Sequence, residues 1–169
     1  MELWLVRHAD AGAPLPGAED DARALTPRGR RQCFRIVRAL AHLGAGLDHV
    51  RHSPLLRAVQ TAEALVPALS AHGTTAVDGG LARAPDHALV ARLAAEGVER
   101  MAIVGHEPWL GALAFWLASG WSAEAPERQP AWLELEKGGV LQLTGTLASG
   151  EMRLRAVYPR RALRLLARG

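Results

Sequence analysis

The chain has little of what stabilises secreted domains or anchors proteins in membranes. It contains one cysteine, Cys33, so no internal disulfide can form, which favours a reducing compartment. No apolar run approaches the roughly 20 residues that a transmembrane helix needs. The start, Met1-Glu2, lacks the positive charge of a secretory signal, and few apolar residues follow before Arg7. We therefore expect a cytoplasmic protein that does not bind membranes.

Lysine is nearly absent as well. Lys137 is the only lysine, so arginine supplies almost all of the positive charge, and the formal net charge is +3. The arginines are scattered along the chain rather than gathered in a low-complexity arm, so the sequence does not indicate nucleic-acid binding. A small anionic substrate fits the same composition.

The length of the chain limits it to one folding unit. At 169 residues, of which 49% are hydrophobic, it can fill one core and is too short for two ordinary domains. We find no internal repeat and no linker. We expect a single domain over residues 1–169, and a monomer.

Apolar runs alternate with helical patterns along the chain. We expect buried strands at 1–6, 49–52, 75–77 and 101–104, and helices at 27–43, 54–69, 86–95 and 108–117. This alternation predicts an α/β fold with a mostly parallel central sheet and helices on both faces. Apolar runs at 131–135, 140–147 and 152–157 predict further strands, with a turn at Gly138-Gly139 between the first two.

Two helix starts are marked by a hydroxyl residue followed by proline. Thr26-Pro27 and Ser53-Pro54 each predict an N-cap with proline in the first turn. Pro67 is expected to bend or end the second of these helices early.

Basic and imidazole side chains follow three of the expected strands. Arg7 and His8 follow the first strand, Arg57 lies one turn into the helix after the second, and His106 follows the strand at 101–104. Ligands of open α/β sheets bind beyond the carboxyl ends of the strands, so we expect these four side chains to converge. A neutral imidazole can attack phosphorus, while guanidinium groups neutralise and orient the phosphoryl oxygens. Such a site needs no metal and no cofactor.

Four blocks carry a resemblance to a known family. "LVRHADA", "LTPRGRRQ", "HSPLLRAVQTAEAL" and "IVGHEPWLGAL" occur in this order, and the chain resembles the histidine phosphatase superfamily, specifically its short SixA-type phosphohistidine phosphatases. The resemblance implies a phosphoglycerate mutase-like fold. It implies that His8 is the nucleophile that becomes phosphorylated and that Arg7, Arg57 and His106 form the phosphate pocket. Taken singly, each of these residues would be read as structural or solvated.

The chain departs from the superfamily pattern at two places. Ala9 stands where the usual motif has glycine, and the segment "DGGLARAPDH" has no glutamate where mutases and many ester phosphatases keep a proton donor. Phosphohistidine releases an imidazole, which leaves more readily than an alkoxide, so the missing donor favours phosphohistidine as the substrate. Glu107 is a possible proton donor, although a carboxylate in the first turn of a helix is also stabilised by the helix dipole alone.

Other polar and aromatic residues receive structural interpretations. We expect surface or loop positions for His42, His49, His52, His72 and His87, and core or rim packing for Trp109, Trp116, Trp121 and Trp132. The acidic run at 19–21 is interpreted as solvated rather than metal-binding, and Thr26 and Gly29 as structural. Asp10 is expected near the site through its loop.

These observations together predict a metal-independent phosphatase. The favoured partner is a protein that carries phosphohistidine. One alternative is a phosphatase for a small phosphate ester, such as a sugar phosphate or nucleotide. The other is a non-catalytic module that binds phosphorylated protein through the same pocket.

Overall fold

The strands form one sheet in the computed structural model, which describes residues 1–13, 20–121 and 133–168. Its order is β3-β2-β4-β1-β5-β6, with the bounds β1 Glu2–Arg7, β2 Leu47–His52, β3 Leu69–Val77, β4 Arg100–Gly105, β5 Val140–Gly145 and β6 Met152–Tyr158. The first four strands along the chain pair in parallel, while β5 pairs antiparallel with both β1 and β6. The predicted α/β fold with a mostly parallel sheet is confirmed.

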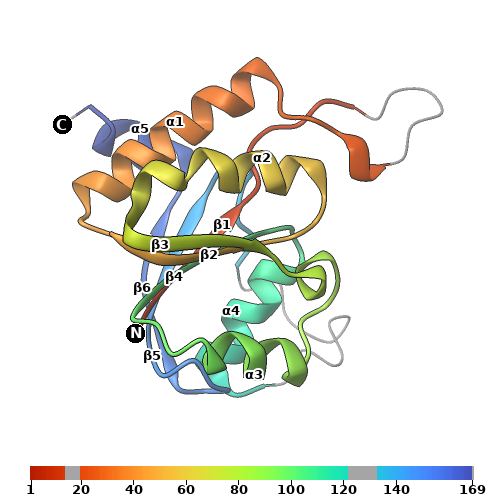
Figure 1. Cartoon of the computed structure of the whole chain (residues 1–169), viewed down its shortest axis with the longest axis vertical. Coiled ribbons are helices and arrows are strands. Elements are labelled where there is room, and N and C mark those ends of the chain that lie inside the picture. Colours follow the sequence, from red (N-terminus) through yellow and green to blue (C-terminus); the bar gives the residue numbers. More distant parts are fainter. Residues whose placement is uncertain (14–19, 122–132, 169) are drawn as a thin grey trace.

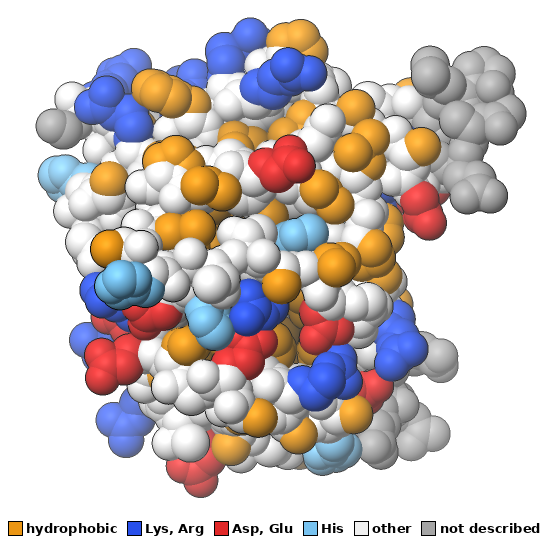
Figure 2. All heavy atoms as spheres, in the orientation of Figure 1, with side chains coloured by type: hydrophobic (Ala, Val, Ile, Leu, Met, Phe, Trp, Pro, Cys, Tyr) orange, Lys and Arg blue, Asp and Glu red, His pale blue; other side chains and the backbone are white. Residues whose placement is uncertain are grey.

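Helices cover both faces of this sheet (Figure 1). On one face lie α1, α2 and α5, which span Pro27–His42, Leu56–Ala64 and Arg160–Leu166, and on the other lie α3 and α4, which span His87–Ala95 and Trp109–Ser119. Short 3-10 turns occur at Asp20–Ala22 (η1), Val66–Ala68 (η2) and Gly79–Ala82 (η3). Figure 2 shows Lys and Arg side chains gathered over α1 and α5. In the described ranges, no helix has the length and apolar character to cross a membrane.

Strand β1 separates two cores. Leu3 and Leu5 pack in the cluster that includes residues of α3 and α4, whereas Trp4 and Val6 pack in the cluster that includes residues of α1 and α2. All four side chains are at most 1% exposed. Because successive side chains of a strand point to opposite faces, a strand covered on both sides must be apolar throughout. The strand ends where this apolar run gives way to Arg7.

The start of α1 is tied to the loop that follows β1. The amide of Gly29 donates to Thr26 Oγ1 at 3.0 Å, which is the predicted N-cap bond. The Thr26 hydroxyl in turn donates to Asp10 Oδ2 at 2.8 Å, and the Thr26 amide donates to the Asp10 carbonyl at 3.0 Å. The structural interpretation of Thr26 and Gly29 is therefore correct, and the pair holds the chain that leads away from His8.

The second predicted N-cap is wrong. Helix α2 begins at Leu56, and its N-cap residue Leu55 makes no side-chain capping bond. The helix ends at Ala64, and Pro67 lies in the 3-10 turn η2, so the predicted early end is confirmed. Ser53 remains in the loop after β2.

The tail of the chain differs from the prediction in two elements. Residues 133–135 form no strand and 131–132 lie outside the described residues, so Gly138-Gly139 closes no hairpin. The Leu135 amide donates to Glu107 and its carbonyl accepts from Arg7, so side chains satisfy the backbone there instead of a neighbouring strand. Helix α5 was not predicted, because it is short and has no capping side chain.

Substitution of Gly29 tests the close approach of α1 to the Asp10 loop. A Cβ atom at position 29 would overlap the Asp10 carbonyl oxygen, and backbone cannot move aside cheaply. We expect Gly29→Ala to lower the free energy of unfolding by roughly 2 kcal/mol or more, as substitutions that strain packed backbone do. Urea unfolding measures this loss. Gly12→Ala is the matched control in the same loop, since nothing lies within 4 Å of its added Cβ; equal losses in both variants would contradict the argument.

Candidate active site

Three adjacent strands deliver the site residues to one edge of the sheet. In the parallel register Arg7 faces Gly105, and the amide of His8 continues the ladder by donating to the Gly105 carbonyl at 3.0 Å. On the other side of β4, the amide of Ser53 donates to the Val104 carbonyl at 3.0 Å. The residues that follow β1, β2 and β4 therefore lie side by side, as the strand ends predicted.

The two imidazoles that were expected to converge are neighbours. The ring centroids of His8 and His106 are 5.0 Å apart with the planes inclined by 50°. Both residues are buried, with exposed fractions of 5% and 7%. His106 Nε2 lies 2.8 Å from the Ser53 hydroxyl oxygen, whereas its Nδ1 is buried and has no partner among the described residues.

The hydrogen bond of His8 selects its reactive nitrogen. His8 Nδ1 lies 2.8 Å from the carbonyl oxygen of Ala9. A carbonyl can only accept, so Nδ1 carries the proton and Nε2 keeps a free lone pair. The pKa of His8 is lowered to about 4, and burial is the largest cause; the positive charges of Arg57 and Arg7 also lower it, while the Ala9 bond acts in the opposite direction. His8 is therefore neutral at pH 7.

His106 is neutral for similar reasons. Burial is the main cause that lowers its pKa to about 3, and His8 and Arg57 add to the effect. A bound dianion would act in the opposite direction, because an adjacent negative charge favours the protonated imidazole. The site without a ligand thus holds two uncharged imidazoles among cationic side chains.

Arg57 is 7% exposed and already holds an oxyanion. Its Nη1 donates to the Asp20 carbonyl and its Nη2 to Asp20 Oδ2, both at 2.8 Å. The Arg23 hydrogen bond is the main cause that lowers the pKa of Asp20, and Arg57 contributes. The run at 19–21 was interpreted as solvated, and Asp20 does keep 55% of its side chain exposed. Its pairing with Arg57 and Arg23 was not predicted. Glu19 lies outside the described residues.

Arg7 is held by the loop that precedes β5. Its Nη1 donates to the Leu135 carbonyl at 2.5 Å and lies 3.5 Å from Glu134 Oε1. Its Nε is buried and has no partner among the described residues. Arg7 thus retains an unused donor in the region where its charge acts on both imidazoles.

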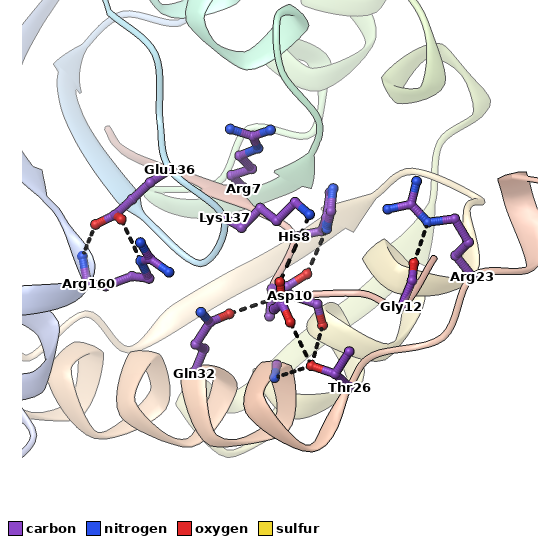
Figure 3. A network of polar contacts seen from close by, with 12 residues as sticks. Arg7, His8, Asp10, Gly12, Arg23, Thr26, Gln32, Glu136, Lys137 and Arg160 are labelled. Atoms are coloured by element: carbon purple, nitrogen blue, oxygen red, sulfur yellow. Dashed lines mark hydrogen bonds and ion pairs between the residues drawn. The ribbon is translucent and has the colours of Figure 1, made fainter. Parts of the chain in front are cut away.

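Asp10 joins the site to α1 and to the loop before β5 (Figure 3). Its amide donates to Gln32 Oε1 at 2.8 Å, and its Oδ1 lies 3.9 Å from Lys137 Nζ. Figure 3 shows the Lys137 side chain extending toward His8, and the Lys137 charge also lowers the pKa of His8. The expectation that Asp10 lies near the site is confirmed.

Glu107 bridges two segments through its carboxylate. Oε2 accepts from the Gly111 amide of α4 at 3.0 Å, and Oε1 accepts from the Leu135 amide at 2.8 Å. Burial raises the pKa of Glu107 against these two bonds. Both oxygens are used as acceptors, so the structural explanation accounts for this residue without a proton-donor role.

Two of the histidines that were expected at surface or loop positions lie in β2 instead. His52 was expected at the surface and is buried at the end of β2, where its Nδ1 lies 3.0 Å from the Ser53 carbonyl oxygen. His49 lies within β2, half-buried, and pairs with Glu96. Within residues 1–13, 20–121 and 133–168, no group of histidine, cysteine or acidic side chains is arranged to hold a metal ion.

The tryptophans differ in their surroundings. Trp116 is a core residue, as expected, and Trp109 lines a small cavity together with His106. Trp121 is 70% exposed, so core or rim packing is wrong for it. Trp132 lies outside the described residues.

Three residues near the site were not predicted there. Ser53 was interpreted as an N-cap, Asp20 as solvated, and Lys137 was noted only for its rarity. The position of Lys137 could have been predicted, because it lies beside the Gly138-Gly139 turn just before an apolar run. Such a side chain lies at the end of a strand, and ligands of α/β sheets bind at strand ends. For Asp20 no signal existed, since its pairing depends on the fold of a loop.

These contacts define an oxyanion-binding site with a nucleophilic nitrogen. Two guanidinium groups flank two neutral imidazoles, and one imidazole presents an unprotonated Nε2. Such a set suits transfer of a phosphoryl group to histidine.

Comparisons with known proteins agree with this chemistry. The model of the histidine phosphatase superfamily (branch 1) matches residues 3–81. The phosphohistidine phosphatase SixA of Escherichia coli strain K12 is 31% identical over 124 residues, which cover 71% of this chain and 76% of that protein. The chain belongs to the histidine phosphatase superfamily and is a phosphatase of the type that acts through a histidine.

Solved structures of the same fold include different phosphatases. The protein histidine phosphatase SixA in complex with tungstate superposes with a TM-score of 0.80 at 24% identity, covering 96% of this chain and 99% of that one. The α-ribazole phosphatase of Shigella flexneri superposes with a TM-score of 0.70 at 19% identity, covering 95% and 97%. These likenesses establish the fold.

The low pKa of His8 predicts how stability depends on pH. The unfolded chain protonates His8 near 6.5 and the folded chain near 4, so between these values the unfolded state binds more protons. The free energy of unfolding therefore falls as the pH falls through this range. When the pH is lowered from 7 to 5, we expect the free energy of unfolding of His8→Gln to fall by roughly 1–2 kcal/mol less than that of the wild type. Urea unfolding at both pH values measures it; identical losses would contradict a depressed pKa.

Proposed function

We propose that this protein removes the phosphoryl group from phosphohistidine in proteins, with His8 as the nucleophile and with Arg7, Arg57 and His106 as the phosphate pocket. The observation that carries the choice of substrate is that Glu107, the acidic side chain next to His106, uses both carboxylate oxygens as acceptors. An alkoxide leaving group needs a positioned acid, whereas a phosphorylated imidazole leaves readily once it takes a proton from water. Among the described residues, both acids at the site, Glu107 and Asp20, are engaged in hydrogen bonds, which suits the second kind of leaving group.

The first step forms the covalent intermediate. The lone pair of His8 Nε2 attacks phosphorus, a new N–P bond forms, and the N–P bond of the substrate breaks as its imidazole takes up a proton from water. The phosphoryl oxygens replace the Asp20 carboxylate on Arg57, which already binds an oxyanion in this position. His106, whose buried Nδ1 has no partner among the described residues, gains a proton near the dianion and donates it in a hydrogen bond.

The second step regenerates the enzyme. Water attacks the phosphoryl group and the N–P bond to His8 breaks. One proton of this water stays on the inorganic phosphate, the other returns to solvent and replaces the proton taken up in the first step, and His8 is neutral again. The guanidinium groups neutralise the equatorial oxygens in both transition states. Of the described residues, only His8 forms a bond to phosphorus, while His106 gains and loses a proton, and the scheme calls for neither metal nor cofactor.

A small phosphate ester is the second candidate substrate. The likeness in fold to an α-ribazole phosphatase supports it, while the higher sequence identity to SixA supports phosphohistidine. A panel of phosphohistidine protein, sugar phosphates and nucleotides, assayed side by side with purified enzyme, separates the two. We expect the highest kcat/KM on phosphohistidine; a preference for any ester would overturn this assignment. Binding of the phosphohistidine protein without any turnover would instead indicate a non-catalytic module.

Removal of the nucleophile tests the covalent step. We expect His8→Ala to abolish turnover and to yield no acid-labile, base-stable phosphoenzyme after rapid quenching with labelled substrate, because the variant lacks the proposed nucleophilic nitrogen. His72→Ala, which changes an exposed histidine in β3, is the control and should form the phosphoenzyme normally. A phosphoenzyme in the His8 variant would rule out the proposed nucleophile.

Glu107→Gln tests whether a proton donor is present. An amide can replace one accepting oxygen but presents NH2 to the other backbone amide, so we expect a stability loss of roughly 1–3 kcal/mol. Turnover of phosphohistidine should change by less than about twofold, since departure of imidazole needs no acid from this side chain. A donor role would instead lower alkyl ester turnover by roughly a hundredfold.

The control for this variant is Glu151→Gln, which changes an exposed glutamate and should affect neither stability nor turnover. Rates are compared per folded molecule at 25 °C, with the folded fraction taken from urea unfolding curves of the same preparations. This comparison keeps the loss of stability separate from a loss of chemistry.

A further inference from the structure

A basic groove lies between α1 and α5, beside the phosphate pocket. It has a volume of about 330 Å³ and is lined by Arg28, Arg31, Gln32, Arg35, Glu136, Arg160, Arg161 and Arg164. Figure 2 shows the positive side chains gathered over these two helices. We call this feature the arginine groove. Six of its eight lining residues are arginines, and one is acidic.

The arginines of the groove are poorly explained by the stability of the fold. Neither α1 nor α5 contains an acidic residue, and both have arginines in the first turn, where the helix dipole favours acids. Arg28, Arg31 and Arg35 follow one face of α1 at spacings where like charges repel. Repulsion between these arginines destabilises the free protein, and a negatively charged partner would relieve it. We therefore look for a binding role of this surface.

The groove already contains the kind of contact that such a partner would make. Glu136 accepts from the Arg160 amide at 2.6 Å and from Arg160 Nε at 2.5 Å. The other five arginines have no carboxylate partner among the described residues. Guanidinium groups bind carboxylates through paired hydrogen bonds, so the groove offers several equivalent positions that remain unused.

Contacts among the described residues connect the groove with the catalytic pocket. Gln32 lines the groove and accepts from the amide of Asp10, which is two residues after His8. Glu136 lines the groove, and the next residue, Lys137, extends toward His8. Figure 3 shows Gln32, Glu136 and Arg160 on the same side of His8. Gln32 and the neighbouring residues Glu136 and Lys137 thus join the wall of the groove to the loops at His8.

We propose that the arginine groove binds an acidic segment of the phosphorylated protein next to its phosphohistidine. The proposal rests on the proposed function, because it assigns a recognition surface to that substrate. From Arg28 to Arg35 the helix rises by about 10 Å, which corresponds to about three residues of extended chain. The segment therefore needs only a few acidic side chains in a row.

A nucleic acid fits the groove less well than a peptide. Sites for single strands combine positive charge with aromatic side chains on which bases stack. The groove residues that the structure describes include no aromatic ring. The favoured occupant is thus a short acidic peptide, and nucleic acid is left as an outcome of the test.

Two triple variants with equal charge change test the groove. The groove variant is Arg31→Glu, Arg161→Glu, Arg164→Glu; the control is Arg38→Glu, Arg153→Glu, Arg155→Glu, which changes exposed arginines outside the groove. Turnover of a small aryl phosphate at physiological ionic strength, where distant charges are screened, should stay within about twofold of wild type in both variants. Turnover within this range would show that the fold and the catalytic pocket of both variants are intact.

Binding is measured with two unphosphorylated peptides of equal length, one with a run of glutamates and one with glutamines at the same positions. We expect the wild type and the control to bind the glutamate peptide at least about tenfold more tightly, and the groove variant to lose this preference. Equal binding of the two peptides by the wild type, or equal losses in both variants, would overturn the proposal. Tighter binding of a single-stranded oligonucleotide of matched charge, lost in the groove variant, would also overturn it.

Phosphohistidine versions of the same peptides connect binding with catalysis. We expect the groove variant to raise KM for the glutamate peptide at least about tenfold while kcat stays constant. Equal kcat/KM of the wild type on both peptides would show that the groove does not select substrate, although the proposed function stands. Hydrolysis of neither peptide would overturn the proposed function, while the binding data still decide whether the groove holds acidic segments.

Discussion

Parallel pairing between β1 and β4 is the constraint on which the site depends. It places Arg7 opposite Gly105, so that the residues after both strands emerge next to each other and the His8 and His106 rings lie 5.0 Å apart. The pairing is itself fixed by the two cores, because a slip of one residue would exchange the side chains packed on α3 and α4 with those packed on α1 and α2. Hydrophobic packing on both sides of the sheet therefore determines where the two imidazole rings lie.

The electrostatics of the site follow from the same burial. Two imidazoles placed in a buried region beside Arg7 and Arg57 remain neutral, since a proton on either would be both desolvated and repelled. Because His8 is neutral, its Nε2 keeps a lone pair, and the positive charges of Arg7 and Arg57 remain available to bind an anion. Asp20 supplies that anion within the chain, and its exposed position allows it to withdraw from Arg57.

The sequence was sufficient for those parts of the structure that depend on local patterns. Alternating apolar runs predicted the α/β sheet, and strand ends predicted that Arg7, His8, Arg57 and His106 would meet. The sequence-based prediction failed where long-range contacts determine the structure. Ser53 binds His106 across 53 positions instead of capping a helix. Residues 133–135 form a loop, although two of the three are leucines. Asp20 and Arg57 are 37 positions apart, a pairing that no periodicity encodes. Helix α5 is too short for its pattern to stand out.

The loop before β5 supports the site through its backbone. The Leu135 amide binds Glu107 and the Leu135 carbonyl binds Arg7, so one residue fixes the acidic side chain after β4 and the guanidinium at the end of β1. Every amino acid except proline offers the same two groups. Relatives can therefore exchange the residue at this position freely, within the limits of its buried side chain, and keep the support. A segment important to the geometry of the site would then leave no motif in a comparison of sequences.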